Sequence, residues 1–451
     1  MHYFKLLICL FFISPLFGQN NLEIEYSIKK IVASIEEPKF RDFEVNILNF
    51  GAKGDGEKNC HKAFTKALKK IDQKGGGTLI VPKGIYLING PIHLVSNLNL
   101  HLETGSILKF GSNPDDYLPT VKTSWEGTFL YNYSPFIYGY GLNNVAITGK
   151  GIIDGEGHIN WPDWKEIQAA DQELSRTMNH NDIAIEDRQF GKDHFLRPQL
   201  VQFFNCSNIL VEGIRIEDSP FWCLHMLRSN NITIKNISFD AQNKNNDGID
   251  LEYSSNVLIE GVDFNNGDDN IAIKAGRDTE GRNNHKTPTE NVVIRNCKFK
   301  GLHALVIGSE MSAGVRNVFV VDNVASGYLK RGIYFKTNSD RGGYIKDIFI
   351  KNLKLLDTED CLYMTANYHG EGSGKHASKI SDVVIENVHC LTSSNTAIVI
   401  EGYPTSKVEN LLLKNITVET ATNGVTITNT KNVIMEEVII GEKAGVPTAA
   451  Q

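Results

Sequence analysis

The sequence lacks several features that are typical of whole classes of proteins. It has no cluster of basic residues, and 46 Lys and Arg against 53 Asp and Glu give a net charge of −7, which argues against nucleic-acid binding. None of its seven cysteines forms a C-x-x-C pair, so we expect no zinc site, and the wide spacing of the cysteines assigns no specific disulfide. Beyond the first 20 residues no apolar run approaches transmembrane length, so we expect no membrane span.

The N-terminus has the pattern of a secretory signal peptide. Lys5 is followed by an unbroken apolar run, Leu6 to Ile13, which is too short to cross a bilayer as a helix. Small residues follow at Ser14 and Gly18, so we predict a signal peptide over residues 1–18 and export to the periplasm or the exterior. The alternative is a buried N-terminal strand, which fits the flanking residues less well.

One short phrase recurs along the chain: an Asn, an alternating apolar run, a polar or Gly corner, and a second alternating run. The clearest copies are NVAITGKGIID from Asn144, NILVEGIRIED from Asn208, NITIKNISFD from Asn231, NVLIEGVDFN from Asn256, NVVIRNCKFK from Asn291 and NVFVVDNVAS from Asn317, with weaker copies from Asp347, Asp382, Asn410 and Asn432. From Asn208 onward, successive copies start 22 to 35 residues apart.

This repeat predicts the fold class. Each copy holds two or three short strands of period two, which are too small to bury a face alone but can stack on the copies before and after them. The recurrent corner Asn can stack into a ladder of amides. A leucine-rich solenoid would show a different Leu spacing, and a propeller a period of about 40 residues. We therefore predict an all-β protein, a single-stranded right-handed parallel β-helix.

Near the N-terminus the sequence predicts one helix. Residues Cys60 to Gln73 have helical apolar periodicity and are followed by three glycines, so we expect a helix that caps the open end of the solenoid. The glycines at Gly51, Gly54 and Gly56 are not followed by Gly-Lys-Ser/Thr, which favours a turn over a phosphate loop. We predict an N-terminal extension over residues 19–45 and a catalytic β-helix domain over residues 46–451.

One segment interrupts the repeat. Residues Trp161 to Pro198 are polar, charged and aromatic, and long loops in compact proteins are usually functional or disordered. Because exposed aromatic rings suit sugar faces, we expect this segment to form a wall of a substrate cleft, with a surface helix of no role as the alternative.

Two neighbouring coils carry carboxylates at matching places. Asp247 and Asp268 are 21 residues apart, about one short coil, so we expect them side by side. Asp268 and Asp269 are consecutive and would face opposite ways in a regular strand, but Gly267 permits a local distortion that brings both to one side. Glycoside hydrolysis needs two carboxyl groups, and clustered carboxylates drive their pKa values apart. The alternative is that Asp, Asn and Gly are common at β-helix corners.

At this point the chain resembles a known family, the family 28 glycoside hydrolases or polygalacturonases, in particular the bacterial exo-acting type. The resemblance covers nearly the whole chain after the N-terminal extension. The residues that carry it are Phe50 to Gly56, Ser219-Pro220-Phe221-Trp222, Asn245-Asn246-Asp247-Gly248, Gly267-Asp268-Asp269-Asn270, Ile307-Gly308-Ser309-Glu310-Met311-Ser312, Arg331-Gly332-Ile333 and Arg341-Gly342-Gly343-Tyr344.

The resemblance implies hydrolysis with inversion, without a metal or organic cofactor. Asp268 would be the general acid, Asp247 and Asp269 would hold the attacking water, and Asn245 would contact the substrate. An inverting pair of carboxyls is expected roughly 6.5–9.5 Å apart.

The sequence departs from the family around a functional histidine. The usual Gly-His-Gly-Gly is replaced by Gly301-Leu302-His303-Ala304. Counted back from Ile307, Leu302 takes the histidine position; counted forward from Cys297, His303 can take it. One step along a strand reverses the side-chain direction, and we favour His303 in the cleft, tuning Asp268. The alternative is a corner histidine without a role.

A second departure concerns the family's Arg-x-Lys motif, which grips the sugar carboxylate. Here it reads Tyr334-Phe335-Lys336, so the lysine is kept and the arginine is lost. A phenol cannot make the bidentate contact of a guanidinium, although Arg331 is a candidate to compensate. Further candidates for anion contacts are Lys274, Arg277 and Arg341, and each of them can instead be a solvated charge.

The residues one coil earlier remain undecided. Trp222 is either a core residue or part of the cleft, and His225 either lines the lower cleft or does not. Neither is placed in the catalytic set.

We therefore predict a monomeric, exported hydrolase of a pectic, uronate-containing polysaccharide, with exo attack as a hypothesis. Three alternatives stay open: a hydrolase of a decorated polymer such as rhamnogalacturonan, a polysaccharide lyase on the same fold, which would want Ca²⁺, and a non-catalytic carbohydrate-binding β-helix.

Overall fold

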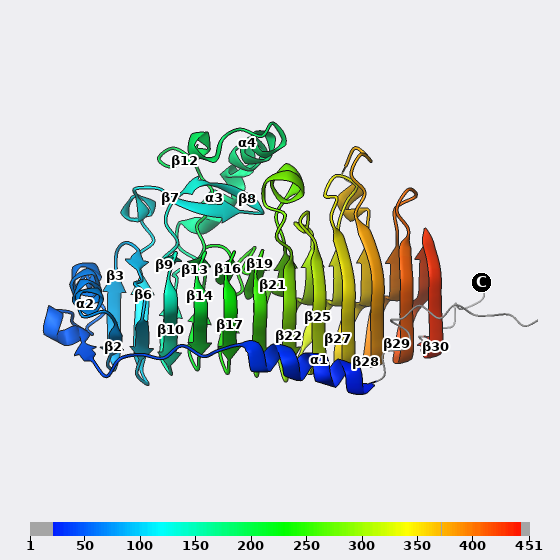
Figure 1. Cartoon of the computed structure of the whole chain (residues 1–451), viewed down its shortest axis with the longest axis horizontal. Coiled ribbons are helices and arrows are strands. Elements are labelled where there is room, and N and C mark those ends of the chain that lie inside the picture. The colour runs from blue at the N-terminus through cyan, green and yellow to red at the C-terminus, as the bar shows by residue number, and fades with distance from the viewer. Residues whose placement is uncertain (1–20, 371, 443–451) are drawn as a thin grey trace, which may run out of the picture.

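The computed structural model describes residues 21–370 and 372–442, so the predicted signal peptide lies outside the described residues. The described chain winds into a long right-handed parallel β-helix, which confirms the predicted fold class (Figure 1). No described helix is long and apolar enough to cross a membrane. The six described cysteines are buried and free.

The largest sheet of the described part has 22 strands. Its members are β1 (Glu44–Asn46), β2 (Gly77–Val81), β4 (Ile92–His93), β5 (Leu98–Leu102), β9 (Ile137–Tyr140), β10 (Asn143–Gly149), β13 (Val201–Phe204), β14 (Ser207–Glu212), β16 (Leu224–Leu227), β17 (Asn230–Lys235), β19 (Ile249–Glu252), β20 (Ser255–Glu260), β21 (Asn266–Lys274), β22 (Thr289–Arg295), β23 (Lys298–Phe299), β24 (Gly301–Gly308), β25 (Val315–Ala325), β26 (Tyr328–Lys336), β27 (Tyr344–Thr365), β28 (Lys379–Glu401), β29 (Val408–Thr428) and β30 (Thr430–Glu442).

Two smaller sheets and a few helices complete the described fold. A parallel sheet contains β3 (Gly84–Ile88), β6 (Ser106–Phe110), β11 (Ile152–Asp154), β15 (Arg215–Glu217) and β18 (Ser238–Asp240), and a third sheet contains β7 (Val121–Trp125), β8 (Thr128–Asn132) and β12 (Gln189–Phe190). The helices are α1 (Asn21–Ser34), α2 (His61–Gln73), α3 (Trp161–Ile167) and α4 (Ala169–His180), with short turns η2 (Ile47–Phe50), η3 (Pro114–Tyr117), η4 (Ile185–Asp187), η5 (Glu280–Asn284) and η6 (Tyr368–Gly370).

The repeated Asn residues mark one corner of the solenoid. Each has a left-handed backbone and donates its amide N–H to the side-chain oxygen of the equivalent Asn one coil earlier. The ladder runs through Asn97, Asn144, Asn208, Asn231, Asn256, Asn291 and Asn317. Asn tolerates this conformation better than most residues, so one residue type supplies both the turn and the stacking.

Apolar residues inside the coil stack in register. Val145 pairs with Ile209, which pairs with Ile232, which pairs with Val257, and all four are fully buried or nearly so. The core is therefore a column of β-branched side chains, which suit the crowded interior of parallel strands.

Two helices cover different parts of the solenoid. Helix α2 lies at the N-terminal end, as predicted for the capping helix (Figure 1). Helix α1 was not predicted; it lies along the outside, where Ile24 and Ile31 pack against Leu258, Val293 and Phe319 on three successive coils. It covers apolar side chains that point out of the coil and would otherwise meet water.

Candidate active site

The candidate site lies on the outer face of the large sheet, where strands β19, β21, β24 and β26 lie next to one another. A pocket of about 290 Å³ opens there. It is lined by six Lys and Arg residues and by five carboxylates. The cations are Lys165, Arg176, Lys274, Arg277, Lys336 and Arg341, and the carboxylates are Glu126, Asp247, Asp268, Asp269 and Glu310.

A local irregularity in β21 brings the two consecutive aspartates to the same pocket. The register between β21 and β24 shifts between Asn266 and Asp269, and both Asp268 and Asp269 line the pocket. A Cβ on Gly267 would lie 2.4 Å from the carbonyl oxygen of Gln242, so only glycine fits the distorted backbone. The distortion expected from the sequence is therefore present.

Asp269 is held as an ionised carboxylate. Its Oδ1 lies 2.7 Å from Nδ1 of His303, and its Oδ2 accepts a hydrogen bond from Nζ of Lys336 at 2.9 Å. Burial by itself raises the pKa of Asp269, but the Lys336 ammonium and the His303 hydrogen bond outweigh burial and hold that pKa well below its usual range.

Asp268 has the opposite tendency. Burial, reinforced by the neighbouring Asp269 carboxylate, raises the pKa of Asp268 above its ordinary value. Its side chain is 24% exposed, whereas that of Asp269 is 1% exposed, so Asp268 is the more accessible of the two. Asn245 donates its side-chain N–H to Oδ2 of Asp268 at 3.4 Å and accepts from Arg197 at 2.7 Å.

Asp247 lies directly before β19, at the pocket wall. Burial raises the pKa of Asp247 well above its usual range, and Asp250 and Asp268 raise it further, while the Lys274 ammonium opposes them. Nζ of Lys274 is 3.8 Å from Asp247 and 3.6 Å from Asp250. Asp247 and Asp268 thus have raised pKa values, and Asp269 beside them has a lowered one. This arrangement is suited to acid and base roles.

The histidine predicted for the cleft lies in the pocket. His303 faces Asp269 across one strand pair and lines the pocket, whereas Leu302 does not. Nδ1 of His303 lies 2.7 Å from Asp269 and 3.8 Å from Asp268, so its nearest carboxylate is Asp269, whereas the sequence favoured Asp268. Within residues 21–370 and 372–442 the buried Nε2 of His303 has no hydrogen-bond partner.

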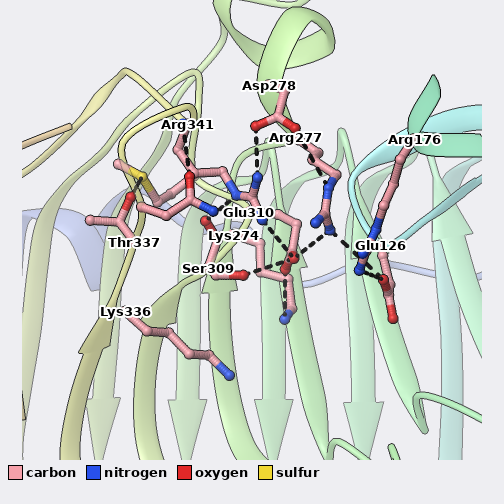
Figure 2. A network of polar contacts seen from close by, with 12 residues as sticks. Glu126, Arg176, Lys274, Arg277, Asp278, Ser309, Glu310, Lys336, Thr337 and Arg341 are labelled. Carbon is pink, nitrogen blue, oxygen red and sulfur yellow. Dashed lines mark hydrogen bonds and ion pairs between the residues drawn. The ribbon is translucent and has the colours of Figure 1, made fainter. Parts of the chain in front are cut away.

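Glu310 is a pocket residue that the sequence reasoning did not single out. Figure 2 shows it at the centre of a charge network, with Nζ of Lys274 at 3.4 Å, Arg277 at 3.1 Å and the Ser309 hydroxyl at 2.9 Å. Burial alone raises the pKa of Glu310, but Lys274 and Arg277 overcome burial and lower it strongly. The signal was present, because Glu310 belongs to a motif that carried the family resemblance.

The remaining cations of this network are also engaged. Arg341 donates to Asp278 at 2.7 Å and to the carbonyl oxygen of Ser309 at 3.0 Å (Figure 2). Burial lowers the pKa of Arg277 to about 10, so it stays protonated at neutral pH. The predicted anion contacts Lys274, Arg277 and Arg341 therefore line the pocket while paired with carboxylates.

The long excursion supplies one wall of the pocket, but not through its aromatic residues. Lys165 of α3 and Gln172 and Arg176 of α4 line the pocket, and Gln172 and Arg176 donate to Glu126 in the β7–β8 turn at 2.8 and 3.3 Å. Trp161 was expected to be exposed and is fully buried, because its ring packs into the hydrophobic core. Polar side chains form the wall instead.

Two predicted substrate contacts do not line the pocket. Tyr334 is 4% exposed and packs edge-on against His303, with ring centroids 5.2 Å apart. The Arg331 guanidinium lies 4.5 Å from the Tyr334 ring and 4.1 Å from the Tyr363 ring, and its Nε is 3.4 Å from Asp360. Arg331 therefore does not replace the missing arginine inside the pocket, because its contacts with these two rings and with Asp360 hold it aside.

The structure also settles the two undecided residues of the previous coil. Trp222 lines the pocket and lies 4.7 Å from Nζ of Lys274, as in a cation–π contact. His225 is fully buried and contacts Glu252 at 3.0 Å, outside the pocket lining. On the other side of the pocket, Tyr368 and His369 complete the lining and had not been predicted.

One group in the described chain has the composition of a metal site. Asp268, Asp269 and His303 present ligand atoms within 4.8 Å of one another. One oxygen of Asp268 is therefore closer to one oxygen of Asp269 than the roughly 6.5–9.5 Å expected from the sequence for an inverting pair of carboxyls. A cation there would compete with the Lys336 ammonium, which already contacts Asp269 at 2.9 Å. The group therefore fits a proton-transfer role better than a metal.

The sequence and the fold are similar to those of known proteins. The sequence profile described as "Glycosyl hydrolases family 28" matches residues 120–438, and one described as "Rhamnogalacturonase A/epimerase, pectate lyase-like" matches residues 44–109. The crystal structure of a hyperthermoactive exopolygalacturonase from Thermotoga maritima superposes with a TM-score of 0.84 at 38% identity, covering 92% of this chain and 96% of that one.

Curated relatives are more distant. A "probable polygalacturonase" of Vitis vinifera is 29% identical over 84% of this chain and 75% of its own length. An exo-poly-alpha-D-galacturonosidase of Dickeya chrysanthemi is 25% identical over 79% of this chain, which spans 64% of that relative's length. Since the family profile covers more than half of the sequence and a solved structure is 38% identical, the chain belongs to family 28 of the glycoside hydrolases.

Proposed function

We propose that this glycoside hydrolase cleaves the glycosidic bonds of galacturonate units in a pectic polysaccharide, with inversion at the anomeric carbon. The observation that carries the proposal is the different setting of two adjacent carboxyls. Asp269 is 1% exposed and contacts Nζ of Lys336 at 2.9 Å and Nδ1 of His303 at 2.7 Å, whereas Asp268 is 24% exposed and, among the described residues, has no ammonium at that distance. In line with these contacts, burial raises the pKa of Asp268, and Lys336 and His303 lower that of Asp269. Such a pair holds a proton donor and a proton acceptor at the same pH.

In this mechanism Asp268 gives its proton to the leaving glycosidic oxygen as the bond to the anomeric carbon breaks. A water oxygen attacks that carbon from the opposite face, and its proton passes to a carboxylate. Asp269 is the carboxylate that Lys336 and His303 keep ionised, and Asp247 lies beside it to hold the water. Asn245 orients Asp268 through its amide.

The cations of the pocket favour an acidic sugar. Lys274, Arg277 and Arg341 gather around one carboxylate, Glu310, and Lys336 is paired with Asp269. A sugar carboxylate near this network would meet several N–H donors already oriented by their partners.

We further propose exo attack. Residues of α3 and α4 and the Glu126 turn line the same pocket as the catalytic aspartates, which supports a groove closed on that side. Product analysis on galacturonate oligomers tests this hypothesis: single sugars or short units released from one end are expected, and a ladder of internal products would contradict it.

One observation favours a second candidate, hydrolysis of a decorated polymer such as rhamnogalacturonan. At the family's usual arginine position the chain has Tyr334, and Arg331 contacts the rings of Tyr334 and Tyr363 rather than lining the pocket. A subsite with fewer guanidinium contacts binds a sugar carboxylate less strongly, so it favours carboxylated sugars less over neutral ones.

The deciding experiment is reducing-sugar release from polygalacturonate by the mature protein, beside Asp268→Asn. We expect release by the wild type and a loss of roughly 10²- to 10⁴-fold in the variant, the usual contribution of a general acid. The exposed Asp263→Asn serves as a matched control and should retain activity.

The alternatives give different results. A silent wild type would contradict polygalacturonate as the substrate and direct the assay to rhamnogalacturonan. Loss of activity with a chelator and a rise in unsaturated product would indicate a lyase, and retained binding without turnover would indicate a non-catalytic protein.

We also propose that the mature enzyme is exported and acts as a monomer. The pattern of Lys5 and the apolar run from Leu6 supports export. All groups assigned above to catalysis come from a single chain, which supports function without a second subunit.

A further inference from the structure

A second hollow lies on the same outer face as the catalytic pocket. It has a volume of about 480 Å³ and is lined by His93, Leu94, Val121, Lys122, Tyr131, Tyr138 and Tyr140. Tyr140 is 50% exposed, and its ring stacks against that of Tyr138 with centroids 6.1 Å apart. Tyr138 is 6% exposed and Tyr131 is partly buried, so Tyr140 presents the accessible ring. An exposed tyrosine backed by further aromatic rings in a concave surface is typical of a binding site.

The hollow is separated from the catalytic pocket by the β7–β8 hairpin. Successive strands of the sheet connect Tyr138 to β21: Tyr138 pairs with Gln202, Gln202 with His225, His225 with Asp250, and Asp250 with Ala272 of β21. Four strand spacings, roughly 19 Å, therefore separate Tyr138 from the catalytic strand. The hairpin is sealed to the sheet between them, because Thr123 donates to Gln202 at 2.9 Å and both are buried.

The same hairpin builds both sites. Glu126, at its turn, lines the catalytic pocket, whereas Lys122 and Tyr131, at its other end, line the hollow. The hydroxyl of Tyr138 donates to the carbonyl oxygen of Lys122 at 2.6 Å, which fixes the hairpin against the tyrosine pair. A sugar chain in the hollow therefore cannot run straight into the catalytic centre.

The described residues that line the hollow include one lysine, Lys122, and no carboxylate, in a protein of net charge −7. Among the described residues, Lys122 has no carboxylate within ion-pair distance. The same holds for the exposed Arg228, which is not part of the lining and whose Nη1 lies 3.4 Å from Nδ1 of His285. Burial chiefly, then the positive charges of Arg228 and Lys122, lower the pKa of His285 to about 4. A lysine without a carboxylate partner beside an exposed tyrosine ring matches an anionic ligand with an apolar face.

From this geometry we propose that the tyrosine hollow is a second, non-catalytic saccharide site that binds a segment of an acidic polysaccharide. A pyranose ring has an apolar C–H face, which a tyrosine ring can cover, and a hydroxyl rim; a uronate adds the carboxylate that Lys122 would meet. The inference rests on the proposed pectic substrate, and its role is to hold the enzyme on the polymer while chain ends enter the pocket.

The test is affinity electrophoresis of the full mature chain in gels containing polygalacturonate, with Asp268→Asn in every protein so that the polymer is not cut. We expect Tyr140→Ala and Lys122→Ala each to weaken retention by about tenfold, equivalent to about 1.4 kcal/mol. The control Lys66→Ala, an exposed lysine on α2, removes the same charge and should be retained like the parent.

Retention unchanged in both variants would overturn the proposal. Unchanged retention together with a lower sedimenting mass of Tyr140→Ala would also overturn it and assign the hollow to a second copy of the chain. Turnover of digalacturonate by the same variants with Asp268 restored should equal that of wild type. If the wild type does not turn over digalacturonate, the proposed function is contradicted but the proposed saccharide site is not, because retention in the gel measures binding in the hollow separately.

Discussion

The buried carboxylate of Glu310 should contribute strongly to the stability of the catalytic pocket. It is 7% exposed, Nζ of Lys274 and Nη1 of Arg277 lie 3.4 and 3.1 Å from it, and Arg341 lies 3.9 Å away. In Glu310→Gln these buried cations lose their shared anion, and breaking a buried pair on one side costs about 3 to 5 kcal/mol. We expect a loss of this size in the free energy of unfolding at pH 7, measured by urea denaturation.

The pH dependence of this loss gives an independent check. Because the pKa of folded Glu310 is depressed below its ordinary 4.5, its contribution is present above pH 4.5 and is lost as the pH falls toward the folded value. Gln does not titrate, so the difference between the two proteins should shrink below pH 4.5.

A matched control separates burial from simple charge pairing. Glu290 receives a hydrogen bond from Arg316 at 2.6 Å, but these side chains are 26% and 43% exposed. Glu290→Gln should therefore cost less than about 1 kcal/mol. Equal denaturation midpoints for Glu310→Gln and wild type at pH 7 would refute the view that Glu310 neutralises the pocket cations.

Two further predictions follow from the site and the solenoid. Lys336→Met removes the ammonium that lowers the pKa of both Asp269 and Asp268. Both the acidic and the basic limb of the profile of kcat/KM against pH should therefore move to higher pH. Limbs at their wild-type positions would contradict the roles assigned to these two aspartates. Asn231→Ala should cost about 2 kcal/mol in unfolding free energy, from a left-handed backbone and lost ladder bonds. Asn231→Gly should cost less, because glycine relieves the backbone; an equal loss in both would assign the effect to the hydrogen bonds alone.

Much of the fold was predictable because the signals are local. The alternating runs after each Asn set which side chains enter the coil, and the left-handed corner at residues such as Asn231 and Asn256 repeats the turn. The capping helix was predicted from the apolar spacing between Cys60 and Gln73, and α2 begins one residue later, at His61. The covering helix α1 was not predicted, because its partners lie more than 200 residues away on several coils.

The functional site was only partly predictable. Short motifs placed Asp247, Asp268 and Asp269 together, since neighbouring coils bring matching positions side by side. The tyrosine hollow was not predicted, because in the sequence Tyr140 is one more residue of an apolar strand. Only the packing of the β7–β8 hairpin beside that strand forms the hollow.

By itself, then, the sequence determined the parallel β-helix and the three aspartates on adjacent coils, since both depend on period-two patterning and a regular coil length. Only the tertiary structure decided which carboxylate stays ionised, because Lys336 reaches Asp269 from a strand 67 residues away. It also decided that Arg331 lies aside against two tyrosine rings and that Glu310 gathers the pocket cations. These outcomes depend on side-chain packing and charge pairing across coils, which local sequence patterns do not encode.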